Sequence, residues 1–114
     1  MDNCIFCKIA RGEIPSAKVY EDGQTLAFRD ISPMAPTHVV VIPKRHVGSL
    51  NELDGLDEAG QLALLRACRK AAELEGVAGS GYRVVTNCGP DAGQTVQHLH
   101  LHVLGGRKLR IDMV

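Results

Sequence analysis

The spacing of apolar positions predicts a helix and a hairpin at the start of the chain. The run CIFCKIARG predicts a short helical turn that stops at its final glycine. The runs KVYED and TLAFRDI each predict a short strand. Because Asp22 and Gly23 lie between them, the two strands are expected to form a β-hairpin.

A third strand and a long helix are predicted next. THVVVIP is rich in β-branched residues and must leave regular structure near Pro43, which is typical of a strand. From Asp57 to Gly76 the apolar period becomes helical, and Gly76 is the expected stop. The apolar stripe of this helix comprises Leu64, Leu65, Cys68, Ala71 and Ala72. Its opposite, charged face comprises Arg66, Arg69, Lys70 and Glu73.

The last two predicted strands are YRVVTN and VQHLHLHVL, separated by the loop CGPDAGQT. This loop is too short for a parallel crossover, so the strands are expected to pair antiparallel. The whole pattern predicts an α+β fold, with an antiparallel sheet of about five strands, one principal helix and a short amino-terminal helix. A single domain is expected over residues 1–114.

Composition and charge narrow the class of protein. Hydrophobic residues make up 45% of the 114 residues, enough for one core without disulfides. Basic and acidic residues both total 13, so no overall field attracts nucleic acid or an anionic membrane, and neither is an expected partner. The amino terminus lacks the apolar core of a signal peptide, and no segment approaches the roughly 20 apolar residues of a membrane span. We therefore expect a cytoplasmic protein with reduced thiols.

The stretch HLHLH places His98, His100 and His102 at alternate positions, so on a strand they share one face. The three leucine and valine positions that alternate with them face the core: Leu99, Leu101 and Val103. The histidines fit a solvent-exposed face, a metal site or a site for phosphoryl chemistry. A solvent-exposed face does not require imidazole side chains, so the first of these explanations is not favoured. Since strand positions two apart are separated by about 6.5 Å, the outer two rings bind one ion only if the strand bends strongly. We therefore favour divided labour, with the middle ring as a nucleophile, because an ordinary imidazole is largely neutral at pH 7.

The loop before this strand favours an anion at the same place. In GPDAGQT two glycines allow successive main-chain N–H groups to turn toward a phosphate. Gln94 and Thr95 add side-chain donors. Such loops are common in ordinary hairpins, so it is the position beside three histidines that favours phosphate binding.

Three segments of the chain resemble those of a known protein family. GQTVQHLHLHVLGGR is similar to the signature of the histidine triad family, in which three histidines alternate with apolar residues. AFRDISPMAPTHVVVIPKRH and EIPSAKVYED extend the resemblance from Cys4 to Arg107, and the LGGR ending favours the Hint branch. That branch implies a homodimer that hydrolyses purine nucleoside phosphoramidates and aminoacyl nucleotides and releases a nucleoside monophosphate.

The resemblance also implies roles for individual residues. His100 is the expected nucleophile, His102 and His38 support it and the phosphate, and Asp30 binds ribose hydroxyls. A carboxylate suits the ribose, although an aspartate at a strand end is more often a turn former. The expected phosphate and leaving-group side comprises Asn87, Gln94, Thr95 and the main chain of Val96. The expected base pocket comprises Ile5, Phe6, Ile9, Phe28 and Ile31, of which the phenylalanines could equally be core. The family's tryptophan-containing carboxyl terminus is absent, and KLRIDMV stands in its place.

The pair Cys4-x-x-Cys7 fits a zinc site, a redox disulfide or two small buried residues. A thioredoxin-like pair follows a strand, whereas this pair lies at the amino terminus, so zinc is favoured. Resemblance to zinc-bearing members of the superfamily points to His46 and His98 as the other two ligands. Such a closed site is structural, and it would orient the ring of the first triad histidine.

The sequence therefore predicts a nucleotide-binding hydrolase that works through a nucleotidyl-histidine intermediate. The enzymatic alternative is a Fhit-like dinucleoside polyphosphate hydrolase, which the same GQTV segment also fits. A protein of another class, a nucleotide-dependent scaffold with incidental hydrolysis, is also consistent with the sequence.

Overall fold

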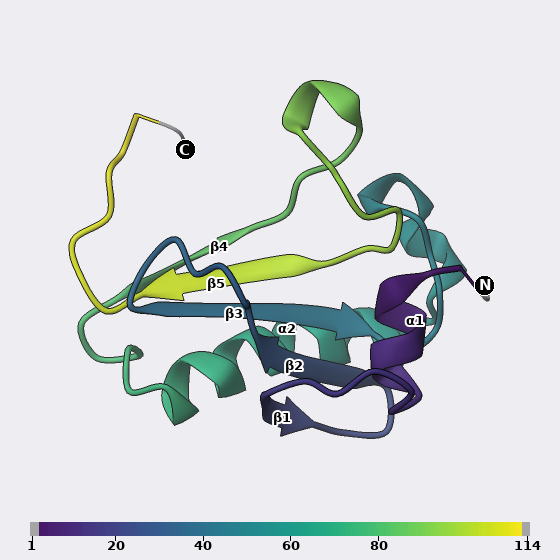
Figure 1. Ribbon diagram of the computed structural model, residues 1–114, viewed down its shortest axis with the longest axis horizontal. Helices are drawn as coiled ribbons and strands as arrows, with labels where there is room; N and C mark the ends of the chain where they lie inside the picture. The colour runs from purple at the N-terminus through teal and green to yellow at the C-terminus, as the bar shows by residue number, and fades with distance from the viewer. Residues whose placement is uncertain (1–2, 113–114) are drawn as a thin grey trace.

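The computed structural model describes residues 3–112, which form a five-stranded antiparallel sheet with a long helix along one face (Figure 1). The strands lie in the order β1-β2-β3-β5-β4. Their bounds are Lys18–Glu21 for β1, Thr25–Arg29 for β2, Thr37–Pro43 for β3, Tyr82–Val85 for β4 and Leu101–Gly105 for β5. The helices are α1 (Ile5–Ala10) and α2 (Glu58–Leu74), and two 3-10 turns span Leu50–Gly55 (η1) and Pro90–Ala92 (η2). The predicted α+β class, hairpin and antiparallel sheet are confirmed.

Helix α2 begins and ends as its sequence predicts. The carboxylate of Asp57 accepts a hydrogen bond from Gly60 N at 2.7 Å, and Gly76 follows the helix in the left-handed region with a φ of 76°. The helix packs against β1, β2, β3 and β5. The prediction that Leu65 belongs to the buried stripe is wrong, because this side chain is 61% exposed. The buried stripe comprises Gly60, Leu64, Ala67, Cys68, Ala71 and Ala72.

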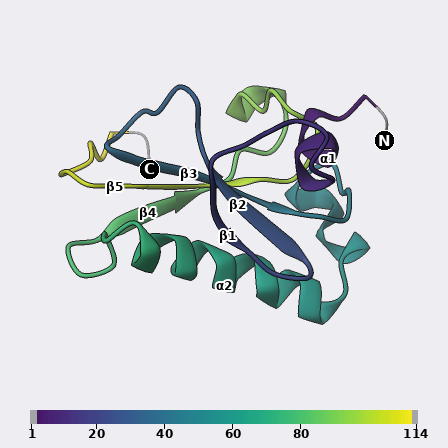
Figure 2. The same cartoon turned by 60° about the horizontal axis from the view of Figure 1, so that its bottom comes forward.

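The other face of the sheet has its own apolar cluster under α1. Figure 2 shows α2 beneath the sheet and α1 on the opposite side. Ile9 of α1 packs there on alternate residues of β2 and β3: Leu26, Phe28, Val40 and Ile42. The intervening residues of the same strands, Ala27, Val39 and Val41, pack toward α2. Both faces of β2 and β3 are therefore buried, which explains why their sequences are apolar at nearly every position.

The last strand is shorter than predicted. β5 pairs antiparallel with both β3 and β4, as expected, but it begins at Leu101 instead of Val96. Before it the main chain bends, because Leu99 N donates to Val47 O at 2.8 Å and His100 O accepts from Thr86 Oγ1 at 2.8 Å. The apolar residues that alternate with the histidines are buried as predicted: Leu99, Leu101 and Val103. His98 and His100 thus precede the strand, and only His102 lies on it.

No helix within residues 3–112 is long and apolar enough to cross a membrane. The cysteines of the chain are free thiols. Cys68 is on the buried face of α2, where burial raises the pKa of its thiol to about 11. This thiol is therefore unreactive at neutral pH, as expected of a core residue.

Candidate active site and metal-ligand cluster

The bend before β5 sends the triad histidines in different directions. His98 is fully buried and turns toward the amino-terminal helix, whereas His102 lies on β5 and faces His38 of β3. The ring of His100 lies between these two directions. Its centroid is 5.1 Å from that of His102 and 5.1 Å from that of Phe6. The three rings therefore have three different sets of partners, which fits the expected division of labour.

A main-chain contact decides which nitrogen of His100 is available. Its Nδ1 lies 2.7 Å from the carbonyl oxygen of His98. Because a carbonyl only accepts hydrogen bonds, Nδ1 of His100 carries the proton and donates it. The lone pair of the neutral ring is then on Nε2. An imidazole held in this way can attack an electrophile through Nε2.

His38 and His102 form a directed chain of donors. Met34 N donates to His38 Nδ1 at 3.0 Å, so the proton of the neutral His38 ring is on Nε2. That nitrogen lies 2.9 Å from His102 Nδ1 and donates to it, which leaves the proton of His102 on its Nε2. His102 can therefore donate to an anion through Nε2.

Both rings of this chain are held neutral at pH 7. Burial lowers the pKa of His38, and the nearby carboxylate of Asp30 opposes this shift. Burial, with His100 and His38 beside it, lowers the pKa of His102 to about 4. Ligand-type atoms of Asp30, His38 and His102 also lie within 4.8 Å of one another. Since Nε2 of His38 carries a proton, we interpret this group as a hydrogen-bond chain and not as a metal site.

Asp30 has a structural role beside the candidate one. Its Oδ1 accepts from Ser32 N at 2.8 Å and stabilises the turn after β2. Its Oδ2 lies 3.5 Å from His38 Nε2, at the edge of the histidine chain. The aspartate is therefore both a turn former and a carboxylate next to the triad.

The apolar residues expected around a base divide into two groups. Phe28 and Ile9 are buried and form the floor of the cluster under α1, and the ring of Phe6 packs on Phe28 with centroids 5.7 Å apart. Ile5 and Ile31 are exposed, the latter at 99% of its surface. Within residues 3–112, Ile31 is thus not packed against the other apolar residues.

The glycine-containing loop is built as predicted, except at Gln94. Gly89 and Gly93 both have positive φ, of 84° and 77°. The amide of Gln94 accepts from Gly89 N at 2.9 Å and donates to Gly48 O and Val96 O at 2.8 and 2.9 Å. Both of its N–H groups are thus used within the fold, and Gln94 holds the loop closed instead of offering a free donor.

Two other residues of this loop region keep free donors. Within residues 3–112, the side chains of Asn87 and Thr95 make no hydrogen bond; Asn87 is half-buried and Thr95 is exposed. Val96 is half-buried, and its carbonyl is the one bound by Gln94. The side chains of Asn87 and Thr95 remain available to a ligand.

A second cluster joins α1 to the start of the triad. Cys4 Sγ lies 3.3 Å from His98 Nδ1, and Cys7 Sγ lies 3.3 Å from His46 Nδ1 and 3.5 Å from His98 Nδ1. The two Nδ1 atoms are 3.1 Å apart. All four ligand-type atoms lie within 4.8 Å of one another. The structure thus brings together the four residues predicted from the Cys-x-x-Cys pair and from the resemblance.

The donor set of this cluster fits a metal ion. His98 Nε2 donates to the carbonyl oxygen of Pro43 at 2.8 Å, so the lone pair of the neutral ring is on Nδ1, which faces the thiols. Two thiols and two imidazole nitrogens are a typical set for a four-coordinate structural ion. His98 also connects the two sites, because its carbonyl holds the ring of His100.

Comparison with known proteins agrees with this geometry. The family model named HIT domain matches residues 11–109, which is most of the chain. The chain belongs to the HIT family. It is 44% identical over 108 residues to the purine nucleoside phosphoramidase of Escherichia coli K12, covering 95% of this chain and 91% of that protein.

Solved structures of the HIT family have the same fold. A HIT family hydrolase from Legionella pneumophila superposes with a TM-score of 0.92 at 46% identity, covering 98% of this chain and all of that one. A HIT family hydrolase from Clostridium thermocellum superposes with a TM-score of 0.94 at 44% identity, covering 100% of this chain and 99% of that one.

In this HIT protein, the sequence alone does not identify the main-chain groups that set the histidine tautomers. Met34 N and the carbonyls of Pro43 and His98 are such groups. Any residue type presents them, so they carry no signal in the sequence.

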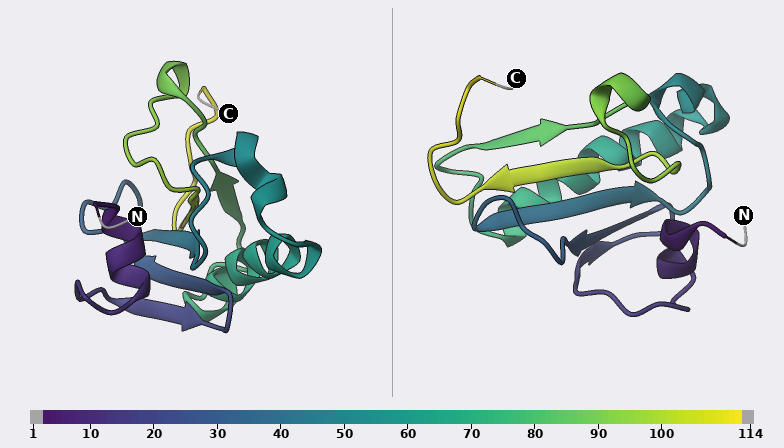
Figure 3. Two further views of the ribbon diagram at one scale, coloured as in Figure 1. Left: turned by 90° about the vertical axis from the view of Figure 1, so that its right-hand side faces the viewer. Right: turned by 45° about the horizontal axis from the view of Figure 1, so that its top comes forward.

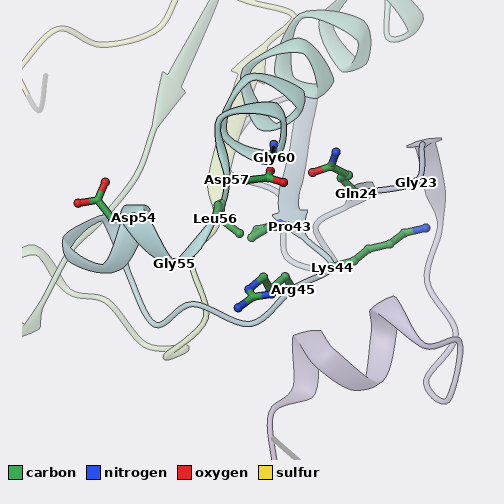
Figure 4. Close-up of a pocket in the computed structure, with 10 residues that line it drawn as sticks. All are labelled: Gly23, Gln24, Pro43, Lys44, Arg45, Asp54, Gly55, Leu56, Asp57 and Gly60. Carbon is green, nitrogen blue, oxygen red and sulfur yellow. Dashed lines mark hydrogen bonds between the residues drawn. The ribbon is translucent and has the colours of Figure 1, made fainter.

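One well-formed cavity of the HIT fold lies away from the triad. It measures about 510 Å³ and is found beyond the carboxyl end of β3, next to the start of α2 (Figure 4). Two of its four charged groups have partners within the fold: Lys44 bonds Glu21 at 2.7 Å, and Asp57 caps α2. None of the triad histidines lines it, so we do not assign the reaction to this cavity.

Proposed function

We propose that this HIT protein hydrolyses purine nucleoside phosphoramidates and aminoacyl nucleotides and releases a nucleoside monophosphate. The observation that carries the proposal is the hydrogen bond from His100 Nδ1 to the carbonyl of His98, which leaves Nε2 free for attack. The relative from Escherichia coli, named a purine nucleoside phosphoramidase, supports the choice of substrate. A small nucleotide, and not a nucleic-acid polymer, is the partner that the neutral net charge favours.

In the proposed reaction, Nε2 of His100 attacks the α-phosphorus and the phosphorus–nitrogen bond breaks. The leaving amine takes up one proton, and the nucleotide is now bonded to His100. Water then attacks the same phosphorus, the bond between phosphorus and His100 Nε2 breaks, and the nucleoside monophosphate is released. The water gives up one proton, which replaces the proton that the leaving amine took from the site. The Nε2–H of His102 donates to a phosphate oxygen and stabilises charge as it develops there. His38 orients this donor through its bond to His102 Nδ1.

We propose that the remaining residues position the nucleotide. The second oxygen of Asp30 accepts from ribose hydroxyls, and Asn87, Thr95 and the main chain of Val96 contact the phosphate or the leaving group. Gln94 acts indirectly by closing the loop. The proposed base pocket has buried walls and exposed edges, and it comprises Ile5, Phe6, Ile9, Phe28 and Ile31.

We propose that zinc is the ion held by Cys4, Cys7, His46 and His98. Tetrahedral zinc with two sulfur and two nitrogen ligands requires ligand atoms about 3.3 to 3.8 Å apart. Four of the six separations between these ligand atoms are 3.1 to 3.5 Å, close to that range, and all six lie within 4.8 Å. Bound zinc stabilises the fold and supplies no chemistry to the reaction. Such thiol ligands require a reducing compartment, which supports a cytoplasmic location.

We propose that the protein is a homodimer. β4 is an edge strand, and its residues on the α2 side, Tyr82 and Val84, are 38% and 41% exposed. Leu62 and Leu65 of α2 are 47% and 61% exposed and line an apolar cavity of about 460 Å³ with Leu50 of η1. A second copy related by a twofold axis presents the same apolar surface, so both copies bury it together.

Substrate comparison tests the function. We expect turnover of adenosine 5′-phosphoramidate and, under rapid quenching, a nucleotidyl adduct on His100 detected by mass spectrometry. Faster turnover of diadenosine triphosphate would favour the Fhit-like alternative. Nucleotide binding with no turnover of either compound would contradict the proposed reaction and favour a scaffold.

A further inference from the structure

Basic side chains gather where β4 begins and β5 ends. Arg83, Arg107, Lys108 and Arg110 lie there, at the end of the sheet from which the carboxyl-terminal segment departs (Figure 1, Figure 3). Within residues 3–112, the one carboxylate that pairs with any of them is Asp112, which bonds Arg110. Four positive charges thus face one negative charge in a chain whose net charge is zero.

The arginines of this basic cluster line a cavity of about 350 Å³. Arg83 Nη1 donates to the carbonyl of Arg110 at 2.6 Å, and Arg107 donates to the carbonyls of Met34 and Lys108 at 3.3 and 3.1 Å. These contacts orient the guanidinium groups without neutralising them. Glu75 lines an adjoining cavity, but Arg29 already binds its carboxylate through two bonds of 2.9 Å. The guanidinium groups of Arg83 and Arg107 therefore have unused donors and no carboxylate partner.

Two residues that line this cavity, Arg83 and Leu104, are neighbours of His102 in the sheet. Opposite β4, Leu104 pairs with Arg83 and His102 pairs with Val85. Arg83 is therefore on the same face as His102 and diagonal to it, at a typical distance of about 7 to 8 Å. On the other side, Arg107 binds the carbonyl of Met34, the residue whose N–H holds His38. Arg83 through the sheet and Arg107 through Met34 are thus each one residue removed from the pair of His102 and His38.

We propose that Arg83 and Arg107 form a subsite for an anionic group on the leaving part of the substrate. This inference rests on the proposed function and specifies its substrate class. A group attached to the α-phosphate on the side away from the base reaches the cavity over Leu104. Arginine binds carboxylates and phosphates through paired N–H donors, so either a carboxylate on the amine or a further phosphate suits this subsite. The two arginines determine specificity and take no part in bond breaking.

A matched pair of substrates tests the proposal. The two compounds are phosphoramidates of AMP. In one the phosphorus is bonded to the amino nitrogen of glutamate α-amide, and in the other to that of glutamine α-amide, so they differ only in the charge of the side chain. We expect kcat/KM of the wild-type protein to be about tenfold higher for the glutamate compound at low salt, and the ratio to fall as salt is added. The ratio should fall to about 1 in Arg83→Gln/Arg107→Gln and recover in part in Arg83→Lys/Arg107→Lys. Arg66→Gln on the exposed face of α2 is the control, since it removes one charge far from the cavity and should keep the ratio.

The outcomes separate this inference from the proposed function. Equal kcat/KM for both compounds in the wild-type protein, or a preference that survives in Arg83→Gln/Arg107→Gln, would overturn the subsite while leaving phosphoramidate hydrolysis intact. No turnover of either compound would overturn the proposed function and the subsite with it. AMP joined through nitrogen to phosphoserine amide, which is also a phosphoramidate, distinguishes the source of the anion: an arginine-dependent kcat/KM above that of the glutamate compound identifies phosphate, and the reverse order identifies carboxylate.

Discussion

A single main-chain contact on the ring of His98, and another on that of His100, decide which nitrogen of each is available. A carbonyl binds Nδ1 of His100 and frees Nε2, whereas a carbonyl binds Nε2 of His98 and frees Nδ1. Two adjacent members of one motif thus present opposite nitrogens, one toward the proposed phosphate position and one toward the thiols. The alternation of histidines in the sequence predicts neither choice, because the deciding groups are carbonyls.

Replacing His100 by asparagine tests its proposed role as the nucleophile. We expect turnover to fall by roughly 10³ to 10⁶, because an amide cannot attack phosphorus, while monophosphate affinity and metal content stay close to wild type. His102→Asn is the comparison, and it should weaken monophosphate binding as well, since it removes a donor to the phosphate. Phosphoramidate assays, calorimetric titration and elemental analysis measure the three quantities. Near-normal turnover of the His100 variant would contradict covalent catalysis by this residue.

For single residues, the sequence is informative where the type of side chain limits its chemistry. It is less informative where the role of a side chain depends on the groups that it contacts in the fold. Cys4 and Cys7 could be predicted from their spacing, and the family resemblance pointed to His46 and His98; the structure brings the four together. Gln94 was expected to offer a donor to a phosphate, and in the structure its amide binds main-chain groups, because an amide binds a phosphate and a main-chain group equally well. One of these partners, Gly48, lies 46 positions away in the chain.

At the scale of elements, hydrophobic period predicts the number and type of elements better than their limits. The hairpin, β3 and α2 follow from their patterns, and the caps of α2 follow from Asp57 and Gly76. The start of β5 could not be predicted, because the alternating pattern continues through the bend: Leu99 is buried on either path. The contact of Leu99 N with Val47 O is a tertiary one and leaves no local trace.

Helix α1 leads to a prediction about the metal content and stability of the protein. It has six residues, too few to be stable alone, and its N-cap residue is the ligand-type Cys4. We expect purified protein to contain about one zinc per chain, and Cys4→Ser/Cys7→Ser to lose it and to unfold at a lower temperature.

Cys68→Ser is the matched control for the double variant, because it changes a buried thiol outside the cluster and should keep the metal. Elemental analysis and thermal unfolding, followed by circular dichroism, give the result. Retention of one zinc in the double variant would show that these cysteines are not ligands.

At the scale of the whole molecule, the two faces of the sheet differ in what remains uncovered. The triad face keeps polar groups free for a ligand, whereas the α2 face leaves apolar side chains exposed beside the edge strand β4. The helix pattern places Leu65 on the apolar stripe, and the structure shows it outside the monomer core. The apolar side chain of Leu65 is explained if a second copy of the protein covers it, since exposed apolar patches of this kind mark interfaces.

Leu65→Asp tests the proposed dimer. We expect the wild-type protein to be a dimer at micromolar concentration and this variant to be a monomer, because a carboxylate in the apolar interface is costly to desolvate. Leu74→Asp is the control, since Leu74 is also exposed on α2 but does not line the apolar cavity. Light scattering measures the mass of each. A monomeric wild-type protein would rule out the dimer.

The stability of the whole molecule should depend on pH through the neutral histidine chain. Burial lowers the pKa of His38, and burial with the neighbouring rings lowers that of His102 to about 4, below the ordinary value near 6.5. The unfolded chain therefore binds protons in a range where the folded one does not. This contribution to stability is fully present above about pH 6.5 and is lost as the pH falls toward 4. We expect the free energy of unfolding to decrease by on the order of 1 to 3 kcal/mol between pH 7 and pH 4.5.

His102→Asn separates this effect from other titrations. Asp30 and His100 face His102 and stay in place, so the variant removes one ring whose proton binding differs between the folded and unfolded states. Its free energy of unfolding, measured by urea denaturation, should fall less steeply with decreasing pH than that of the wild type. Metal content is measured in the same samples, because protonation of the cluster also releases an ion. Equal slopes at equal metal content would show that His102 is protonated as readily in the folded protein as in the unfolded chain.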